Sequence, residues 1–213
     1  MKVNKWTLGL AAVGLVSLPA AAQAEEQMSP VNTALESTTI SGYVNTAAQW
    51  NFGTGNNGLP TYSYNTANKQ DGFSLNTVKL TIEKPLDETQ WAAGYKVDLM
   101  FGEDANSFGT TTFGGASAPS DFAIRQAYVE LRAPVGNGLD FKMGVFDTIV
   151  GYESHDAGNN PQYTRSYGYT IEPYSHTGLL MSYQFNEMIG ASAGIANTYG
   201  PAINQQGWNS SVD

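Results

Sequence analysis

The chain has 213 residues, of which 14% are charged and 12% are aromatic, and it contains 23 glycines and no cysteine. Low charge combined with many aromatic residues excludes an intrinsically disordered chain, and the lack of cysteine excludes a disulfide scaffold or a thiolate metal site. The ten basic residues are outnumbered by 19 acidic ones, and the net charge of −9 argues against a nucleic-acid partner.

Residues 1–24 have the three parts of a secretory signal peptide in the expected order. Lys2 and Lys5 precede an apolar stretch over residues 6–18, and residues 22–24 (Ala-Gln-Ala) form a small-residue cleavage motif. The apolar stretch is too short to cross a bilayer as a helix. We therefore expect cleavage directly after this motif, with a buried apolar helix as the alternative.

The polar residues 25–37 are expected to form a short periplasmic segment before the main domain. Ser29 in the N-cap position and Pro30 in the first turn indicate one short helical turn up to residue 37. No later stretch approaches the ~18 consecutive apolar residues of a membrane-crossing helix. The exported product is therefore either soluble or inserted in a membrane as a closed β-barrel.

Beyond this segment, apolar and polar residues alternate with a period of two, as they do in strands that have one apolar and one polar face. The clearest example covers residues 91–101, where Val97 and Leu99 alternate with Lys96 and Asp98. The expected strands span residues 40–52, 77–83, 91–101, 127–132, 139–145, 177–185 and 189–199. No helix-forming stretch lies between them, which disfavours a parallel α/β sheet.

Long and short connections alternate along the chain. The long ones cover residues 53–72, 102–121 and 147–176, and the short ones cover residues 85–89, 134–138 and 186–188. Antiparallel neighbours joined by turns at one end and by loops at the other produce this order. Transmembrane barrels combine short periplasmic turns with long extracellular loops, so the sequence predicts an all-β, antiparallel up-and-down transmembrane β-barrel.

Three features favour a membrane barrel over a soluble β-sandwich. The strand at residues 91–101 rises roughly 28 Å at a tilt of about 40°, close to the ~25 Å apolar band of an outer membrane. Aromatic residues stand near strand ends, as in the girdles of membrane barrels: Trp50, Phe52, Trp91 and Phe101. Charges of both signs on the polar faces are expected to pair across strands and to line the pore: Lys79, Glu83, Lys96, Asp98, Glu130, Arg132, Asp140 and Lys142. The alternative is the solvated outer face of a sandwich.

Several motifs along the chain are similar to those of a known family. They are Ser-Gly-Tyr-Val at 41–44, Trp-Ala-Ala-Gly-Tyr-Lys-Val-Asp at 91–98, Gly-Asn-Gly-Leu-Asp-Phe-Lys at 136–142, Gly-Val-Phe-Asp at 144–147 with Gly-Tyr-Glu at 151–153, and Asn-Pro-Gln-Tyr-Thr-Arg-Ser-Tyr at 160–167 with Glu-Pro at 172–173 and His-Thr-Gly at 176–178. With them the chain resembles the OmpL-like β-barrel porin family from about residue 38 to residue 201.

The resemblance implies a channel in the outer membrane of a Gram-negative-type bacterium. The implied partners are outer-membrane lipid, the barrel-assembly machinery and small hydrophilic solutes, and assembly into a homo-oligomer is left open. Members of this family are markedly longer, and bacterial single-chain barrels have an even number of strands. We therefore expect residues 38–213 to be the N-terminal part of an outer-membrane β-barrel, with about seven strands of a larger barrel.

Motifs that carry chemistry are few. Ser154, His155 and Asp156 are neighbours in the sequence, so they cannot adopt the geometry of a hydrolase triad by themselves. The acidic loop around them has oxygen ligands for a cation such as Ca²⁺, but its spacing matches no known cation loop, and a solvated loop is favoured. The glycine-rich residues 53–58 lack the Lys-Ser or Lys-Thr of a phosphate-binding loop. We therefore expect no enzyme activity, no cofactor and no resident metal.

Two classes of function are left. The first is a passive channel, narrowed by the long segment 147–176, whose charges suit a constriction: Glu153, Arg165, Glu172 and His176. Small inward residues such as Gly94 and Gly144 leave room for water, and acidic loops predict a weak preference for cations. The second class is an exported binding or structural β-protein without channel activity, either a plugged barrel or a soluble sandwich.

Overall fold

The structure is a computed structural model of the chain, and it describes residues 37–50, 71–88, 91–107 and 120–197. The strands in these ranges are β1 (Thr39–Trp50), β2 (Asp71–Lys84), β3 (Ala93–Phe101), β4 (Phe122–Ala133), β5 (Leu139–Asp147), β6 (Ser175–Gln184) and β7 (Gly190–Ala196). The connections contain the 3-10 helices η3 (Glu103–Ser107) and η4 (Ala157–Asn159) and the short helix α3 (Tyr167–Ile171). The predicted signal peptide, the helical turn that follows it and the glycine-rich residues 53–58 lie outside the described residues.

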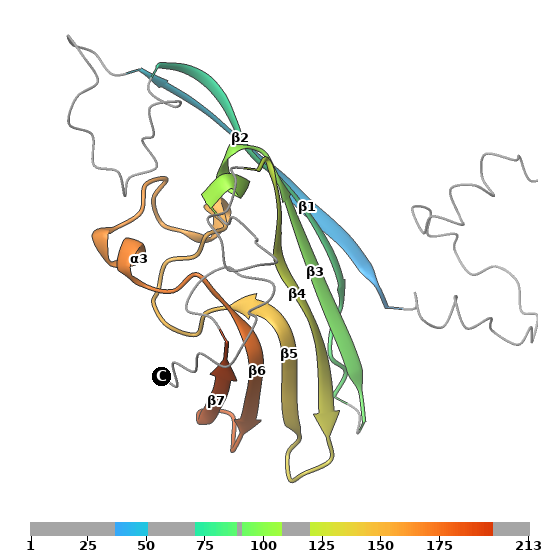
Figure 1. Cartoon of the computed structure of the whole chain (residues 1–213). Helices are drawn as coiled ribbons and strands as arrows, with labels where there is room; N and C mark the ends of the chain where they lie inside the picture. Colours follow the sequence, from blue (N-terminus) through green and yellow to red (C-terminus); the bar gives the residue numbers. More distant parts are fainter. Residues whose placement is uncertain (1–36, 51–70, 89–90, 108–119, 198–213) are drawn as a thin grey trace, which may run out of the picture. The chain divides into compact units, whose positions relative to one another are not determined.

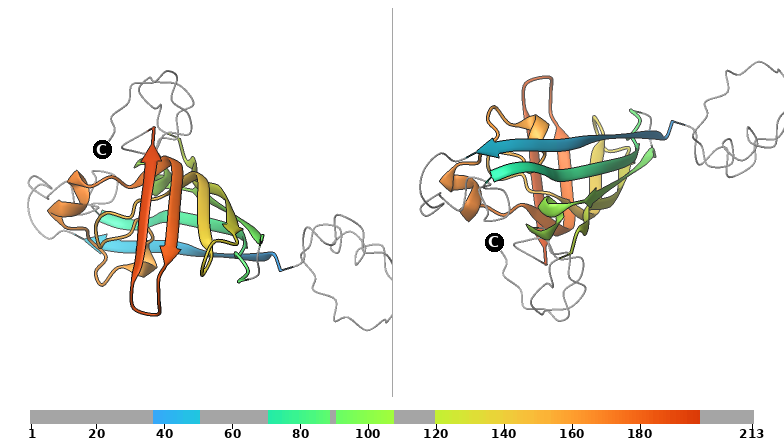
Figure 2. Two further views of the ribbon diagram at one scale, coloured as in Figure 1. Left: turned by 90° about the horizontal axis from the view of Figure 1, so that it is seen from below. Right: turned by 90° about the horizontal axis from the view of Figure 1, so that it is seen from above.

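The seven strands form one sheet in the order β1 to β7, and each strand pairs antiparallel with the next one in the sequence. Figure 1 shows this succession, and Figure 2 shows the same sheet from two further sides. In the part of the chain that the structure describes, the sheet is not closed, because β1 pairs with β2 alone and β7 with β6 alone. The predicted all-β, up-and-down architecture is thereby confirmed, and the open sheet is consistent with part of a barrel.

Two β-bulges make β2 and β4 longer than the sequence pattern predicted. Asn76 in β2 and Arg125 in β4 are extra residues that shift the pairing register with the neighbouring strand. At each bulge two consecutive polar residues, Asn76-Thr77 and Arg125-Gln126, are buried together. The period of two breaks at these positions, so the predicted starts at residues 77 and 127 fell several residues too late.

The other strand boundaries lie within three residues of the predicted ones. β3 begins at Ala93 instead of residue 91, because Trp91 has a φ of 60°, which is incompatible with an extended strand. Turn geometry of this kind is decided by the local backbone, and the alternation of side chains does not report it.

The two faces of the sheet differ in polarity and in exposure. One face presents large apolar side chains without protein cover, among them Val44 at 65% exposure and Met143 at 60%. The opposite face is polar, and Thr77, Asp98 and Gln126 on it are buried. A water-soluble sheet has the reverse arrangement, because its apolar face packs on a core. An uncovered apolar face is suited to lipid.

Aromatic side chains lie at the strand ends, as predicted for the girdles of a membrane barrel. At the end with the long connections, Trp50 meets Phe73 edge-on with ring centroids 5.2 Å apart, and Phe101 lies 5.3 Å from Phe122. At the end with the short turns, Trp91 is 67% exposed. Rings at both borders of the apolar face match the two interfaces of a bilayer. Phe52, the fourth predicted ring, lies outside the described residues.

A small core sits where the connection between β5 and β6 covers the polar face. Residues 148–174 form this connection, which we call the docked segment and which appears in orange in Figure 1. Its Tyr174 packs on the buried cluster of Met100, Ala105 and Ala123, from β3, η3 and β4. None of the described helices is long and apolar enough to cross a membrane.

Candidate functional site

On the polar face of β2 to β5, four of the ion pairs between neighbouring strands join charged residues that the alternation singled out. They are Lys79–Asp98 at 3.1 Å, Glu83–Lys96 at 3.4 Å, Glu130–Lys142 at 3.2 Å and Arg132–Asp140 at 2.7 Å. These are the eight charged residues that the alternation singled out, and their expected pairing across the sheet is confirmed. Their charges cancel in pairs, so this part of the face is polar without a net charge. That they line a pore stays a prediction.

Asp98 is the centre of a buried polar cluster on this face. It accepts hydrogen bonds from the Thr81 hydroxyl at 2.6 Å, the Gln126 amide at 2.8 Å and the Arg125 guanidinium at 3.1 Å, and it also pairs with Lys79. The bulge in β4 explains how two consecutive residues reach the same carboxylate, since a regular strand would point them to opposite faces.

Sequence reasoning missed Arg125, which joins this cluster to the next strand and to the docked segment. Its guanidinium lies 3.1 Å from Asp98, 2.6 Å from Asp147 and 3.7 Å from Asp156. The signal that could have revealed it is a pair of consecutive polar residues, Arg125-Gln126, inside an otherwise alternating strand. The same signal occurs at Asn76-Thr77, the other bulge.

Asp156 holds the docked segment on the polar face through contacts with three strands. One oxygen of its carboxylate accepts a hydrogen bond from the Tyr43 hydroxyl at 3.0 Å, and the other lies 2.8 Å from Lys79 Nζ and 3.7 Å from Arg125. A second contact is the hydrogen bond from the Asn76 amide of β2 to the Tyr163 hydroxyl, at 3.1 Å. The segment therefore lies on the same face as the eight paired charges.

The surroundings of Asp156 favour its ionised form. Burial alone would raise the pKa of this carboxyl group, but the charges of Arg125 and Lys79 and the hydrogen bond from Tyr43 outweigh burial. The net result is a pKa below the ordinary value of an aspartate. The carboxylate is thus a fixed negative charge at neutral pH.

Arg165, which the sequence suggested as a charge at the constriction, supports the shape of the docked segment. It is buried, and its guanidinium donates hydrogen bonds to the carbonyl oxygens of Ser154 at 3.0 Å, Tyr163 at 2.9 Å and His155 at 3.2 Å. Because its donors are committed to the backbone, its main effect in this arrangement is on the fold of the segment. Its predicted contribution to pore charge stays a prediction.

The other three residues predicted for the constriction lie at different places. Glu153 accepts hydrogen bonds from the backbone and the hydroxyl of Ser166, the residue that caps α3. Glu172 follows α3 and lines the same cavity as Glu153. His176 lies in β6, where its Nε2 is 3.1 Å from the Thr148 hydroxyl. The structure thus places the two glutamates at one cavity, whereas the histidine is not part of its lining.

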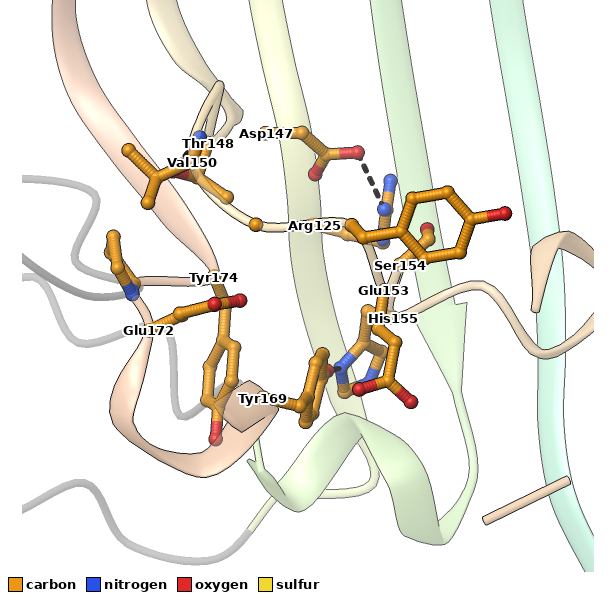
Figure 3. A pocket seen from close by; sticks show the side chains of 13 residues that line it. Arg125, Asp147, Thr148, Val150, Glu153, Ser154, His155, Tyr169, Glu172 and Tyr174 are labelled. Carbon is orange, nitrogen blue, oxygen red and sulfur yellow. Dashed lines mark hydrogen bonds and ion pairs between the residues drawn. The ribbon is translucent and has the colours of Figure 1, made fainter. Parts of the chain in front are cut away.

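A cavity of about 150 Å³ lies between the docked segment and the ends of β4 and β5. Figure 3 shows Arg125 and Asp147 paired on one side of it, with Tyr169 beside His155 on the other, where the Tyr169 hydroxyl lies 2.6 Å from His155 Nδ1. Ser154 Oγ accepts the backbone N–H of Asp156. Within the described ranges, no three His, Cys, Asp or Glu side chains are grouped to hold a metal ion.

An up-and-down antiparallel sheet with an uncovered apolar face and an ion-paired polar face is consistent with part of an outer-membrane β-barrel. The family model described as "Putative beta-barrel porin-2, OmpL-like" matches residues 37–212, and the chain belongs to this family. No curated protein and no solved structure was found to match the chain. Membership in a porin-like family implies an outer-membrane location and suggests a protein without enzymatic activity.

Proposed function

We propose that this protein is an outer-membrane porin through which small hydrophilic solutes or ions diffuse passively. Residues 1–24 export the chain in a Gram-negative-type cell, and the barrel-assembly machinery inserts it into the membrane. The apolar face with Val44 and Met143 meets lipid, and the polar face turns toward the lumen. The family match supports this proposal at the level of a porin-like barrel.

The observation that carries the proposal is the position of the docked segment. Asp156 places a long connection on the charged face, across strands β1, β2 and β4, through Tyr43, Lys79 and Arg125. In a closed barrel, that face surrounds the lumen, so the segment narrows the passage and sets its size limit. A loop lying outside the barrel would make no such contacts.

The charges near this segment predict a weak preference for cations. Lys79 and Arg125 face three carboxylates, those of Asp98, Asp147 and Asp156, so the cluster has one net negative charge. Glu153 and Glu172 add negative charge in the neighbouring cavity. Rings of unbalanced charge select ions by sign, and a small excess gives a modest preference.

Planar-bilayer conductance of the full-length protein tests the proposal. We expect stable single-channel steps, and a reversal potential in a KCl gradient that indicates a small excess of K⁺ over Cl⁻ permeability. A liposome swelling assay with neutral sugars of increasing size then measures the size limit. A correctly folded, membrane-inserted protein without conductance would refute the proposal and support a binding or structural surface protein.

A further inference from the structure

Three donors from three strands converge on the single carboxylate of Asp156. They are the hydroxyl of Tyr43 in β1, the ammonium of Lys79 in β2 and the guanidinium of Arg125 in β4, and we call them the carboxylate cradle. Both oxygens of Asp156 are engaged, one by the hydroxyl and the other by the two cations. The cradle belongs to the sheet, whereas the carboxylate in it comes from a connection.

Lys79 and Arg125 also have ion-pair partners within the sheet itself. Asp98 pairs with both Lys79 and Arg125, and Asp147 pairs with Arg125 at 2.6 Å. Without Asp156 the cluster is therefore neutral and stays anchored in the sheet. The Tyr43 hydroxyl and the Lys79 ammonium would then each lose a hydrogen-bond acceptor in largely buried surroundings, which is unfavourable unless another acceptor enters.

Residues 154–165 of the docked segment, which we call the tip and which include Asp156, have an internal structure of their own. Arg165 binds the carbonyl oxygens of residues 154 and 155 from the far end of this tip. The Asn160 side chain donates to the carbonyl oxygens of Ser154 and Asp156, at 2.7 Å in both cases. Because these bonds are made within the tip, Asp156 can leave the cradle without unfolding residues 154–165.

We propose that the cradle is a binding site for a small carboxylate anion, which Asp156 fills as an intramolecular ligand. A free carboxylate that enters carries the same charge and offers the same two oxygens, so it replaces Asp156 without changing the charge of the cluster. The exchange frees Asp156 from the cradle and loosens the tip, which keeps the hydrogen bond between Tyr163 and Asn76, and this widens the passage. The tethered Asp156 competes with an effective concentration in the mM range, so free carboxylates act at or above about that concentration.

The substitution Asp156→Ala tests the site directly, because it removes the carboxylate and keeps Cβ, and the missing group has the size of formate. We expect sodium formate to raise the thermal unfolding midpoint of the detergent-solubilised full-length variant by a few °C, relative to sodium chloride at the same ionic strength. The matched control is Glu153→Ala, which removes an acid of the same segment outside the cradle and should show a much smaller formate effect, because formate must there compete with Asp156. Equal midpoints for Asp156→Ala in formate and in chloride would overturn the proposal.

Single-channel recording gives a second readout, which rests on the proposed porin function. The carboxylate site predicts that formate changes the conductance in opposite directions in the unmodified protein and in Asp156→Ala. In the unmodified protein, formate should increase the time spent at a larger conductance, because bound formate keeps Asp156 out. In Asp156→Ala, formate should lower the conductance, because it refills the cradle. The recording on the unmodified protein also covers the case in which the variant does not fold.

The outcomes separate the two proposals. Channels whose conductance is the same in formate and in chloride, for both proteins, would refute the carboxylate site and leave the porin function intact. A formate-dependent rise in the unfolding midpoint without any conductance would refute the porin function and support the site.

Discussion

Replacing Arg125 by methionine tests whether the buried ion cluster stabilises the sheet. Arg125 is 1% exposed, and it pairs with Asp98 at 3.1 Å and with Asp147 at 2.6 Å. Methionine has an unbranched, flexible side chain that fills much of the same space, so the substitution removes charge more than volume. Two acids on two strands then lose their shared cation.

The expected loss of stability follows from burial. Removing one partner of a buried ion pair costs about 3–5 kcal/mol, because it leaves an uncompensated charge out of water. Asp98 keeps Lys79, Thr81 and Gln126 as partners, and the Asp147 side chain is 40% exposed and can be hydrated. We therefore expect Arg125→Met to lower the free energy of unfolding by about 3 kcal/mol, near the lower end of this range, which corresponds to roughly a 100-fold change in the folding equilibrium constant.

Urea unfolding of the full-length protein in lipid vesicles, followed by tryptophan fluorescence, measures this change. The matched control is Arg132→Met, which removes an arginine bonded to Asp140 at 2.7 Å through both Nε and Nη2. Both side chains of that pair are partly exposed, so the expected loss is at most about 1 kcal/mol. Equal losses for Arg125→Met and Arg132→Met would refute the reasoning, because burial is the difference between them.

Three further predictions concern the docked segment and the sheet. Deleting Tyr152–Pro173 should raise single-channel conductance, and an unchanged value would place the segment outside the passage. Docking lowers the pKa of Asp156, so docking is fully effective above the ordinary aspartate pKa of about 3.9 and is lost as the pH falls through the lowered pKa. The larger conductance level should therefore become more frequent only below about pH 4. The substitution Asp156→Asn should abolish this dependence of the conductance on pH. Gly144→Ala should cost about 1–3 kcal/mol in the same urea assay, because φ is +134° and the new Cβ would overlap the Ala127 carbonyl oxygen; Gly158→Ala, with nothing within 4 Å of the new Cβ, should cost much less.

The alternation of residue types was enough to predict the sheet and the eight paired charges. A period of two decides which side chains share a face, and the order of turns and loops decides which strands are neighbours. Glu130 and Lys142 illustrate this, because they stand directly opposite each other once β4 and β5 are known to be joined by a short turn. The same reasoning failed at Arg125, because a bulge interrupts the period of two, and the alternation that identifies the strand resumes only after it.

The arrangement inside the docked segment could not be predicted from the sequence. Asp156 and Arg165 are both charged residues of a polar connection, and no periodicity distinguishes them. Their roles depend on tertiary contacts: Asp156 meets two cations of the sheet, whereas Arg165 meets carbonyl groups of its own segment. Sequence reasoning selected the segment for its length and its charges, and it chose Arg165 over Asp156 because it considered charge without the partners; that the segment forms the constriction stays a prediction.

The bulge in β4 also bears on how accurately the sheet assembles. Every second residue of β3 and β4 outside the bulge points to the apolar face, and such a uniformly apolar surface would tolerate a neighbouring strand that is displaced by two residues. On the polar face the same displacement would carry Asp98 away from both Arg125 and Gln126 and break the buried hydrogen bonds that join the two strands. The polar cluster thus favours one register of β3 against β4 over the registers displaced by two residues.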